Sequence, residues 1–125
     1  MVTQALRQNA AMNSLEGIRV LDLSRVLAGP WCTQTLADLG ADVIKIEPPG
    51  TGDSYRHVSV NYGMPQPEHN YPWLLDNRTK RGLALNLASP EGQEVLHRLV
   101  KDADVFITNH PLGVRKKLGV DYETM

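Results

Sequence analysis

Cysteine and aromatic residues are scarce in this 125-residue sequence, and it carries no strong excess of charge of either sign. The one cysteine, Cys32, excludes an internal disulfide framework and is typical of a reducing compartment, so we expect a cytoplasmic protein. The 13 basic and 14 acidic residues leave a net charge of −1. Without an excess of positive charge, the sequence predicts no nucleic-acid partner and no polybasic contact with a membrane.

Long apolar runs and several common catalytic motifs are also absent. No apolar run approaches the roughly 20 residues that cross a membrane. The motifs G-x-G-x-x-G, the P-loop and G-x-S-x-G do not occur, which argues against a nicotinamide dehydrogenase, a P-loop nucleotide hydrolase and an α/β hydrolase. The four histidines lack the spacing of metal ligands, so we predict no metal site.

The residues that are present predict one domain after a short leader. Residues 1–14 show no apolar period, and we interpret them as flexible, whereas 15–125 are enough to build a core. An apolar run over 18–23 is typical of a strand covered on both faces, and a second strand is predicted over 43–46. Between them, Gly29-Pro30 suits the start of a helix, because the N–H that proline lacks has no partner there anyway.

The predicted helix has an apolar period on one face. Cys32, Leu36 and Leu39 fall at i, i+4 and i+7, which predicts that this face is buried and that the thiol is packed and inert. Gly40 suits the left-handed position that ends a helix. Asp22 lies inside the first strand, where a buried carboxylate would need polar partners.

The second half of the sequence repeats the strand-helix-strand pattern after a long irregular segment. Residues 48–77 are rich in proline, and we expect a long loop in which Arg56 and His57 are solvated. Leu83, Leu85 and Leu87 alternate with smaller or polar residues, which predicts a strand. A helix capped by Ser89, a buried strand over Val105–Ile107 and a short helix ending at Gly119 complete the order.

This order predicts an α/β fold: a Rossmann-like, mainly parallel sheet with helices on both faces. Ligands of such sheets bind beyond the carboxyl ends of the strands. After the first strand, the segment Ser24–Pro30 offers a hydroxyl, the cation Arg25 and a helix N-terminus, a combination that suits phosphate. A plain turn with Arg25 solvated is the alternative interpretation of the same residues.

Four blocks of sequence carry a resemblance to a known family. They are LSRVLAGPWCTQ, ADLGADVIKIEPPG, NRTKR, and PEG ahead of ADVFITN. In this order they resemble the family III CoA-transferases, the group of L-carnitine dehydratase, bile-acid-inducible protein and formyl-CoA transferase. The resemblance runs from about Leu15 to the end of the chain. It implies the N-terminal part of a longer enzyme that moves CoA between an acyl-CoA and a carboxylic acid and that forms homodimers.

The resemblance also implies a site for coenzyme A on this chain. In relatives, the matching segments hold adenine, ribose and phosphates at the strand ends. The implied residues are Arg25, Leu27, Ala28, Leu85, Asn86, Leu87, Ala88, Asn109, His110, Pro111 and Lys117. Relatives often have arginine where Lys117 stands, and lysine keeps the charge without the bidentate fork.

Catalysis is expected to lie outside this chain. The family uses an aspartate that forms a covalent acyl anhydride with the substrate, and none of the aspartates here stands in that motif. We therefore predict no catalytic residue among the 125. Asp121 is expected to cap a helix beginning at Tyr122, as in a piece of a longer protein.

Two other interpretations remain open from the sequence. One is a portion of an α-methylacyl-CoA racemase, which shares the fold and the CoA site but abstracts a proton next to the thioester carbonyl. The other is a non-catalytic fragment that binds nucleotides or only associates with a second polypeptide. Catalytic residues beyond this chain would decide between them.

Overall fold

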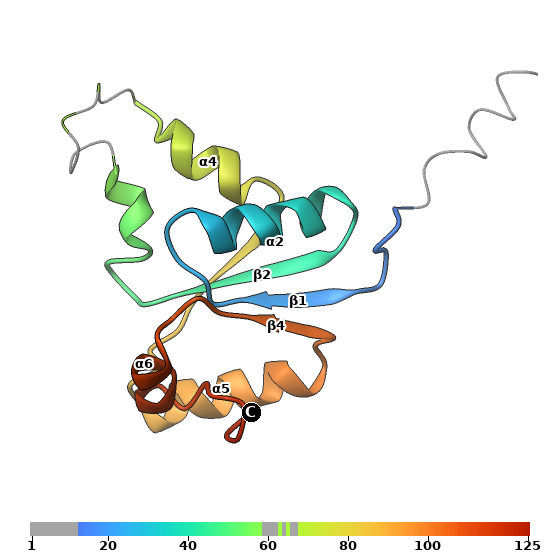
Figure 1. Cartoon of the computed structure of the whole chain (residues 1–125), viewed down its shortest axis with the longest axis vertical. Coiled ribbons are helices and arrows are strands. Elements are labelled where there is room, and N and C mark those ends of the chain that lie inside the picture. The colour runs from blue at the N-terminus through green and yellow to red at the C-terminus, as the bar shows by residue number, and fades with distance from the viewer. Residues whose placement is uncertain (1–12, 59–62, 64, 66–67) are drawn as a thin grey trace, which may run out of the picture.

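The computed structural model describes residues 13–58, 63, 65 and 68–125, so most of the predicted leader lies outside the described residues. Strands and helices alternate along the chain (Figure 1). In order they are β1 (Arg19–Asp22), α2 (Ala28–Asp38), β2 (Asp42–Glu47), the 3₁₀ helix η1 (Ser54–His57), α4 (Tyr71–Asn77), β3 (Arg81–Ala84), α5 (Pro90–Lys101), β4 (Val105–Ile107) and α6 (Leu112–Lys117).

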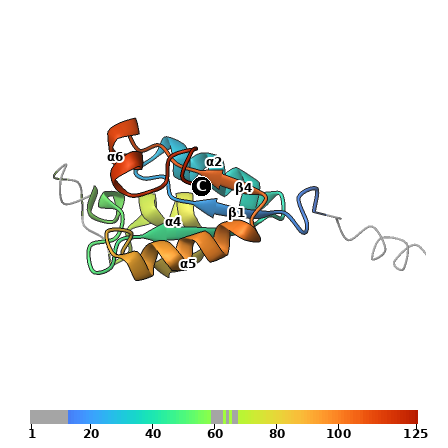
Figure 2. The same ribbon diagram turned by 90° about the horizontal axis from the view of Figure 1, so that it is seen from below.

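The four strands form one parallel sheet in the order β3-β2-β1-β4. Helices α2 and α4 lie on one face of this sheet, and α5 and α6 lie on the other (Figures 1 and 2). The predicted α/β class with a parallel sheet and helices on both faces is therefore confirmed. No helix of the described residues is long and apolar enough to cross a membrane.

The core is divided between the two faces of the sheet because side chains of a strand alternate. Facing α5 is the larger cluster, which consists of Leu21, Leu23, Ile44, Ile46, Leu87, Leu96 and Val120. The cluster that faces α2 is smaller and consists of Val20, Ala41 and Val43, with Leu36 and Ala37 packed against it.

The helix ends predicted at Ser89 and Gly40 are confirmed, whereas the one predicted at Asp121 is wrong. The Ser89 hydroxyl accepts a hydrogen bond from the Gly92 N–H at 3.2 Å, which caps α5 before Pro90. Gly40 follows α2 with φ +101°, a left-handed conformation that glycine adopts without steric strain. Asp121 does not cap a helix: the chain around it forms a turn, in which the Asp121 carboxylate accepts a hydrogen bond from the Thr124 hydroxyl at 2.8 Å.

The predicted buried face of α2 is wrong at Cys32 and Leu39, and only Leu36 of the three packs against the core. Cys32 is exposed and Leu39 is 45% exposed, whereas the buried residues of this helix are Pro30, Thr33 and Gln34. These three also follow a helical period, but two of them are polar, so a search for apolar spacing misses them. Thr33 is drawn inward because its hydroxyl donates a hydrogen bond to the buried Asp22.

Two other predicted boundaries also need correction. The third strand runs over Arg81–Ala84, because β2 pairs with it only as far as Glu47 and the prolines that follow cannot continue the ladder. Leu85 adds a last hydrogen bond from its N–H to the Glu47 carbonyl, 2.8 Å away. The long segment over 48–77 is not simply a loop, because it contains η1 and α4.

Candidate functional site

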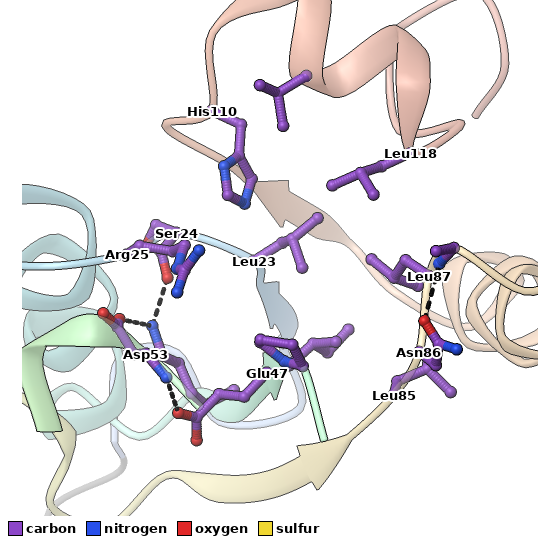
Figure 3. Close-up of a pocket in the computed structure, with 15 residues that line it drawn as sticks. Leu23, Ser24, Arg25, Glu47, Asp53, Leu85, Asn86, Leu87, His110 and Leu118 are labelled. Atoms are coloured by element: carbon purple, nitrogen blue, oxygen red, sulfur yellow. Dashed lines mark hydrogen bonds and ion pairs between the residues drawn. The ribbon is translucent and has the colours of Figure 1, made fainter. Parts of the chain in front are cut away.

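A cavity of about 390 Å³ lies where β1, β2 and β3 end (Figure 3). Parallel strands place their carboxyl ends at one edge, which is where open α/β sheets bind ligands. The lining residues are Leu23, Ser24, Arg25, Lys45, Ile46, Glu47, Pro48, Asp53, Leu85, Asn86, Leu87, Ala88, His110, Val114 and Leu118.

The apolar part of this cavity comes from residues just after strands and from the region of α6. Leu23 follows β1, Leu85 and Leu87 follow β3, and Val114 and Leu118 lie on and just after α6. In Figure 3, His110 and Leu118 project from the α6 side into the space above Leu23. An apolar slot with a few polar groups at its margin is typical of small-molecule sites.

A tight turn after β3 shapes the opposite wall. The Asn86 side chain accepts a hydrogen bond from the Ala88 N–H at 3.1 Å, and the Asn86 backbone carbonyl accepts one from the Ser89 N–H at 3.2 Å. Gly92 of α5 packs against this turn so closely that a Cβ there would lie 1.9 Å from the Asn86 carbonyl oxygen. The position of the turn therefore depends on glycine at residue 92.

Arg25 is the cation at the mouth of the cavity. One guanidinium nitrogen, Nη2, donates a hydrogen bond to the Gly52 carbonyl at 3.1 Å, while Nε is buried and has no hydrogen-bond partner among the described residues. None of the ion pairs formed by the described residues involves Arg25. A cation without a carboxylate partner is available to an anionic ligand.

His110 lies on the other side of the mouth, after β4. Its partial burial lowers the pKa of the imidazole below the usual 6.5, and the positive charge of Arg25 lowers it further. The ring is therefore neutral near pH 7. A neutral imidazole can donate or accept a hydrogen bond without adding charge to the site.

The cavity brings together six of the eleven predicted site residues: Arg25, Leu85, Asn86, Leu87, Ala88 and His110. Asn109 joins them indirectly, because its side chain accepts from the Arg25 N–H and donates to the Arg25 carbonyl, each at 2.9 Å. The other four lie outside the lining. Leu27 precedes α2 and Ala28 begins it, Pro111 precedes α6, and Lys117 is exposed on α6.

A buried ion pair that the sequence did not predict lies in the lining of the cavity. Lys45 Nζ lies 3.2 Å from the Asp53 carboxylate, and both residues are nearly inaccessible to solvent. Lys45 also donates to the Ser24 carbonyl. The lysine stands inside an apolar strand pattern, V-I-K-I, and this interruption was the available signal.

Asp22 has the polar partners that a buried carboxylate requires. It accepts hydrogen bonds from the hydroxyls of Ser24 and Thr33, and Lys80 Nζ lies 3.1 Å away. Burial alone would raise the pKa of Asp22, but the charges of Lys45 and Lys80 and these hydroxyls together lower it below 3.8. The carboxylate is therefore ionised and structural, and it lies away from the cavity lining.

The sequence predicted a solvated Arg56, but its side chain is held by an ion pair and by a stacking contact. Its guanidinium binds both oxygens of Glu47, at 2.9 and 2.7 Å, and stacks on the Trp73 ring with its central carbon 3.9 Å from the centroid. Burial alone would raise the pKa of Glu47, but the bonds from Arg56 and the Asp53 N–H lower it. His57 is exposed, as expected.

The fold and this site define an α/β protein with a ligand cavity at the carboxyl edge of a parallel sheet. The sequence model described as CoA-transferase family III matches residues 15–125. That range is nearly the whole chain, so the chain belongs to CoA-transferase family III.

Individual relatives support this assignment. A succinyl-CoA:glutarate CoA-transferase of Mus musculus is 44% identical over 115 residues, which are 90% of this chain and 25% of the relative. A formyl-CoA:oxalate CoA-transferase of Afipia carboxidovorans is 42% identical over 112 residues, which are 90% of this chain and 26% of the relative. The crystal structure of a CAIB/BAIF family protein from Brucella suis superposes with a TM-score of 0.75 at 43% identity, covering 87% of this chain and 29% of that one. The chain thus spans about a quarter of the length of its relatives.

Proposed function

We propose that this chain supplies the part of a CoA-transferase that holds the nucleotide end of coenzyme A. The observation that carries the proposal is Arg25, a cation without a carboxylate partner among the described residues, at the mouth of an apolar cavity. The leucines that line the cavity suit the adenine ring, and Arg25 suits a phosphate. The curated relatives are named for CoA transfer between carboxylic acids, which favours a transferase over a racemase.

The chemistry of transfer belongs, in this proposal, to residues outside this chain. The full enzyme would move CoA from an acyl-CoA to a carboxylic acid through a nucleophilic aspartate, as a homodimer in the cytoplasm. The chain alone should then bind CoA without turning it over. Incubation with succinyl-CoA and glutarate, followed by mass spectrometry, tests this: product, or an acyl adduct on any aspartate here, would contradict it.

Calorimetric titration of the chain with CoA tests the binding site. Arg25→Ala should weaken binding about tenfold or more, because a charge-assisted contact to phosphate is lost. Arg25→Lys keeps the charge and should lose less. Added salt should weaken binding of the unaltered chain, because the contact is electrostatic.

Lys117 provides a second, separable test. It lies on α6, outside the cavity lining but on the helix that contributes Val114 to it, so we expect it to meet a phosphate that projects from the mouth. Lys117→Ala should weaken CoA binding about tenfold, and dephospho-CoA shows whether the 3′-phosphate is involved. Lys101→Ala, at the far end of α5, is the matched control. If the variants Arg25→Ala, Lys117→Ala and Lys101→Ala all bind CoA with equal affinity, the proposal that CoA binds at this cavity is wrong.

A further inference from the structure

The turn between β1 and α2 holds a β-branched residue in a strained backbone conformation. Val26 has φ +69°, in the left-handed region where a branched side chain is disfavoured. Among the described residues, Thr79 is the only other non-glycine residue with positive φ. Strain of this kind persists only when neighbouring contacts hold it. Val26 therefore requires such a contact.

The carboxylate of Asp53 provides that contact. Both of its oxygens accept a hydrogen bond from the Val26 N–H, at 3.0 and 3.1 Å. Asp53 is 1% exposed, so these charge-assisted bonds are shielded from water. The same carboxylate accepts from the Tyr55 N–H at 3.0 Å and from Lys45 at 3.2 Å, which fixes its orientation.

Asp53 is in turn anchored to the sheet. Its N–H donates a hydrogen bond to the Glu47 carboxylate at 2.8 Å, at the end of β2 (Figure 3). Glu47 is bound by Arg56, and Arg56 stacks on Trp73 of α4. A chain of contacts thus runs from α4 through the end of β2 to the turn that holds Val26.

The strained turn also carries the cation of the cavity. Arg25 directly precedes Val26, and its guanidinium donates to the carbonyl of Gly52, the residue before Asp53. Gly52 has φ +63°, and a Cβ there would lie within 3.0 Å of Arg56 and Glu47. One two-residue segment, Gly52-Asp53, therefore holds both the side chain of Arg25 and the backbone of Val26.

We propose that Asp53 is a positioning residue for CoA binding: it holds Val26 in the left-handed conformation and thereby keeps Arg25 directed at the cavity. The proposal rests on the function proposed above, because Arg25 is the group expected to meet the ligand. Asp53 acts through the backbone of Val26. Without it, the turn spends only a fraction of its time in the binding-competent conformation, and the apparent affinity falls by that fraction.

A suppressor experiment separates this role from a general contribution to stability. Asp53→Ala should weaken CoA binding about tenfold, measured by calorimetry, because the strained conformation of Val26 is no longer held. Val26→Gly removes the strain, since glycine adopts positive φ readily. The double variant Asp53→Ala/Val26→Gly should therefore bind CoA within about threefold of Val26→Gly alone.

A purely structural role for Asp53 predicts a different result. The double variant would then bind as weakly as Asp53→Ala although both are folded by circular dichroism, and that outcome would overturn the proposal. Asp53→Asn is the conservative control, because an amide oxygen can still accept from the Val26 N–H. If Asp53→Ala does not fold because buried Lys45 then keeps only the more distant Asp22 carboxylate, 4.0 Å away, the comparison is made in a Lys45→Met background, which removes that charge.

Amide hydrogen exchange tests the positioning role without CoA. The Val26 N–H should exchange at least about tenfold faster in Asp53→Ala and close to the unaltered rate in Asp53→Asn. Unchanged protection in Asp53→Ala would overturn the proposal whatever the chain binds. If the folded chain does not bind CoA but the exchange rates change as expected, the proposed ligand is wrong and Asp53 still positions the turn.

Discussion

The two faces of the sheet are held in different ways. On the face that α5 covers, the buried residues form one apolar cluster that includes Leu21, Ile44 and Leu96. On the face that α2 covers, the apolar cluster is small, and charged or polar residues are buried beside it. They include Asp22, Thr33, Gln34, Lys45 and Asp53, with the side chain of Lys80.

The apolar face therefore holds the elements together, whereas the polar face fixes how the elements are aligned. Apolar contacts are strong in total but non-directional, and cores tolerate changes of shape if volume is kept. Hydrogen-bonded charges are satisfied in only one arrangement. Lys80 shows the effect: it binds Asp22 of β1, the Pro30 carbonyl of α2 and the Asn77 side chain of α4, and so aligns three elements.

The largest expected effect is the loss of a charge from the polar face. Asp22→Ala leaves Lys45 and Lys80 without their shared carboxylate, and the free energy of unfolding should fall by about 3–5 kcal/mol. Urea denaturation measures it. A loss below about 1 kcal/mol would mean that this face is held by its apolar contacts, and the contrast between the faces would be wrong.

Acid should act through the same carboxylate. The pKa of Asp22 is lower in the folded chain than the unfolded value of 3.8, so its contribution to stability is complete above that value and is lost as the pH falls through the folded pKa. Between pH 5 and pH 2, the free energy of unfolding should therefore fall less in Asp22→Asn than in the unaltered chain. An identical pH dependence in both would show that folding does not lower the pKa of Asp22.

The next effect is a cavity in the apolar face. Leu96 is fully buried against the sheet, and Leu96→Ala should lower the free energy of unfolding by about 2–5 kcal/mol. Leu96→Met nearly conserves volume and should lower it by less than about 1.5 kcal/mol. This tolerance sharpens the contrast, because Asp22→Asn also conserves volume but removes the charge that Lys45 and Lys80 share. If Leu96→Met destabilises the chain as much as Leu96→Ala, the apolar face tolerates a change of side-chain shape no better than the polar face tolerates the loss of a charge.

A smaller effect is expected where α5 touches the wall of the cavity. Gly92→Ala places a Cβ against the Asn86 carbonyl and should destabilise the chain by about 1–3 kcal/mol while also weakening CoA binding. Gly113→Ala is the matched control, since nothing lies within 4 Å of that position and alanine favours the helix by about 0.5–1 kcal/mol. Thermal unfolding of both variants tests the pair, and similar behaviour would contradict the close approach at Gly92.

The smallest effect is expected from a charge pair at the surface of the polar face. Arg78 and Asp38 lie 2.5 Å apart, but their side chains are 47% and 40% exposed. Arg78→Ala should change the free energy of unfolding by less than about 1 kcal/mol, and 1 M salt should remove most of the difference. A salt-independent loss comparable with that of Asp22→Ala would show that burial does not decide the value of these charges.

Much of the fold was predictable because local patterns are strong in this chain. The apolar runs around Val20 and Val43, the Ser89 cap and the glycine at residue 40 each act within a few residues of sequence, and each was placed correctly. The α/β class follows from their order. Six of the proposed site residues line one cavity because parallel strands end at one edge.

The rest depended on contacts between residues far apart in sequence. Spacing made Cys32 appear buried, but the packed residue is Thr33, because its hydroxyl meets an aspartate eleven positions away. Likewise, Arg56 and Lys45 are ordinary charged residues in the sequence, and only the tertiary structure supplies the carboxylates that bury or orient them. Buried polar groups take their meaning from their partners, and no local pattern identifies those partners.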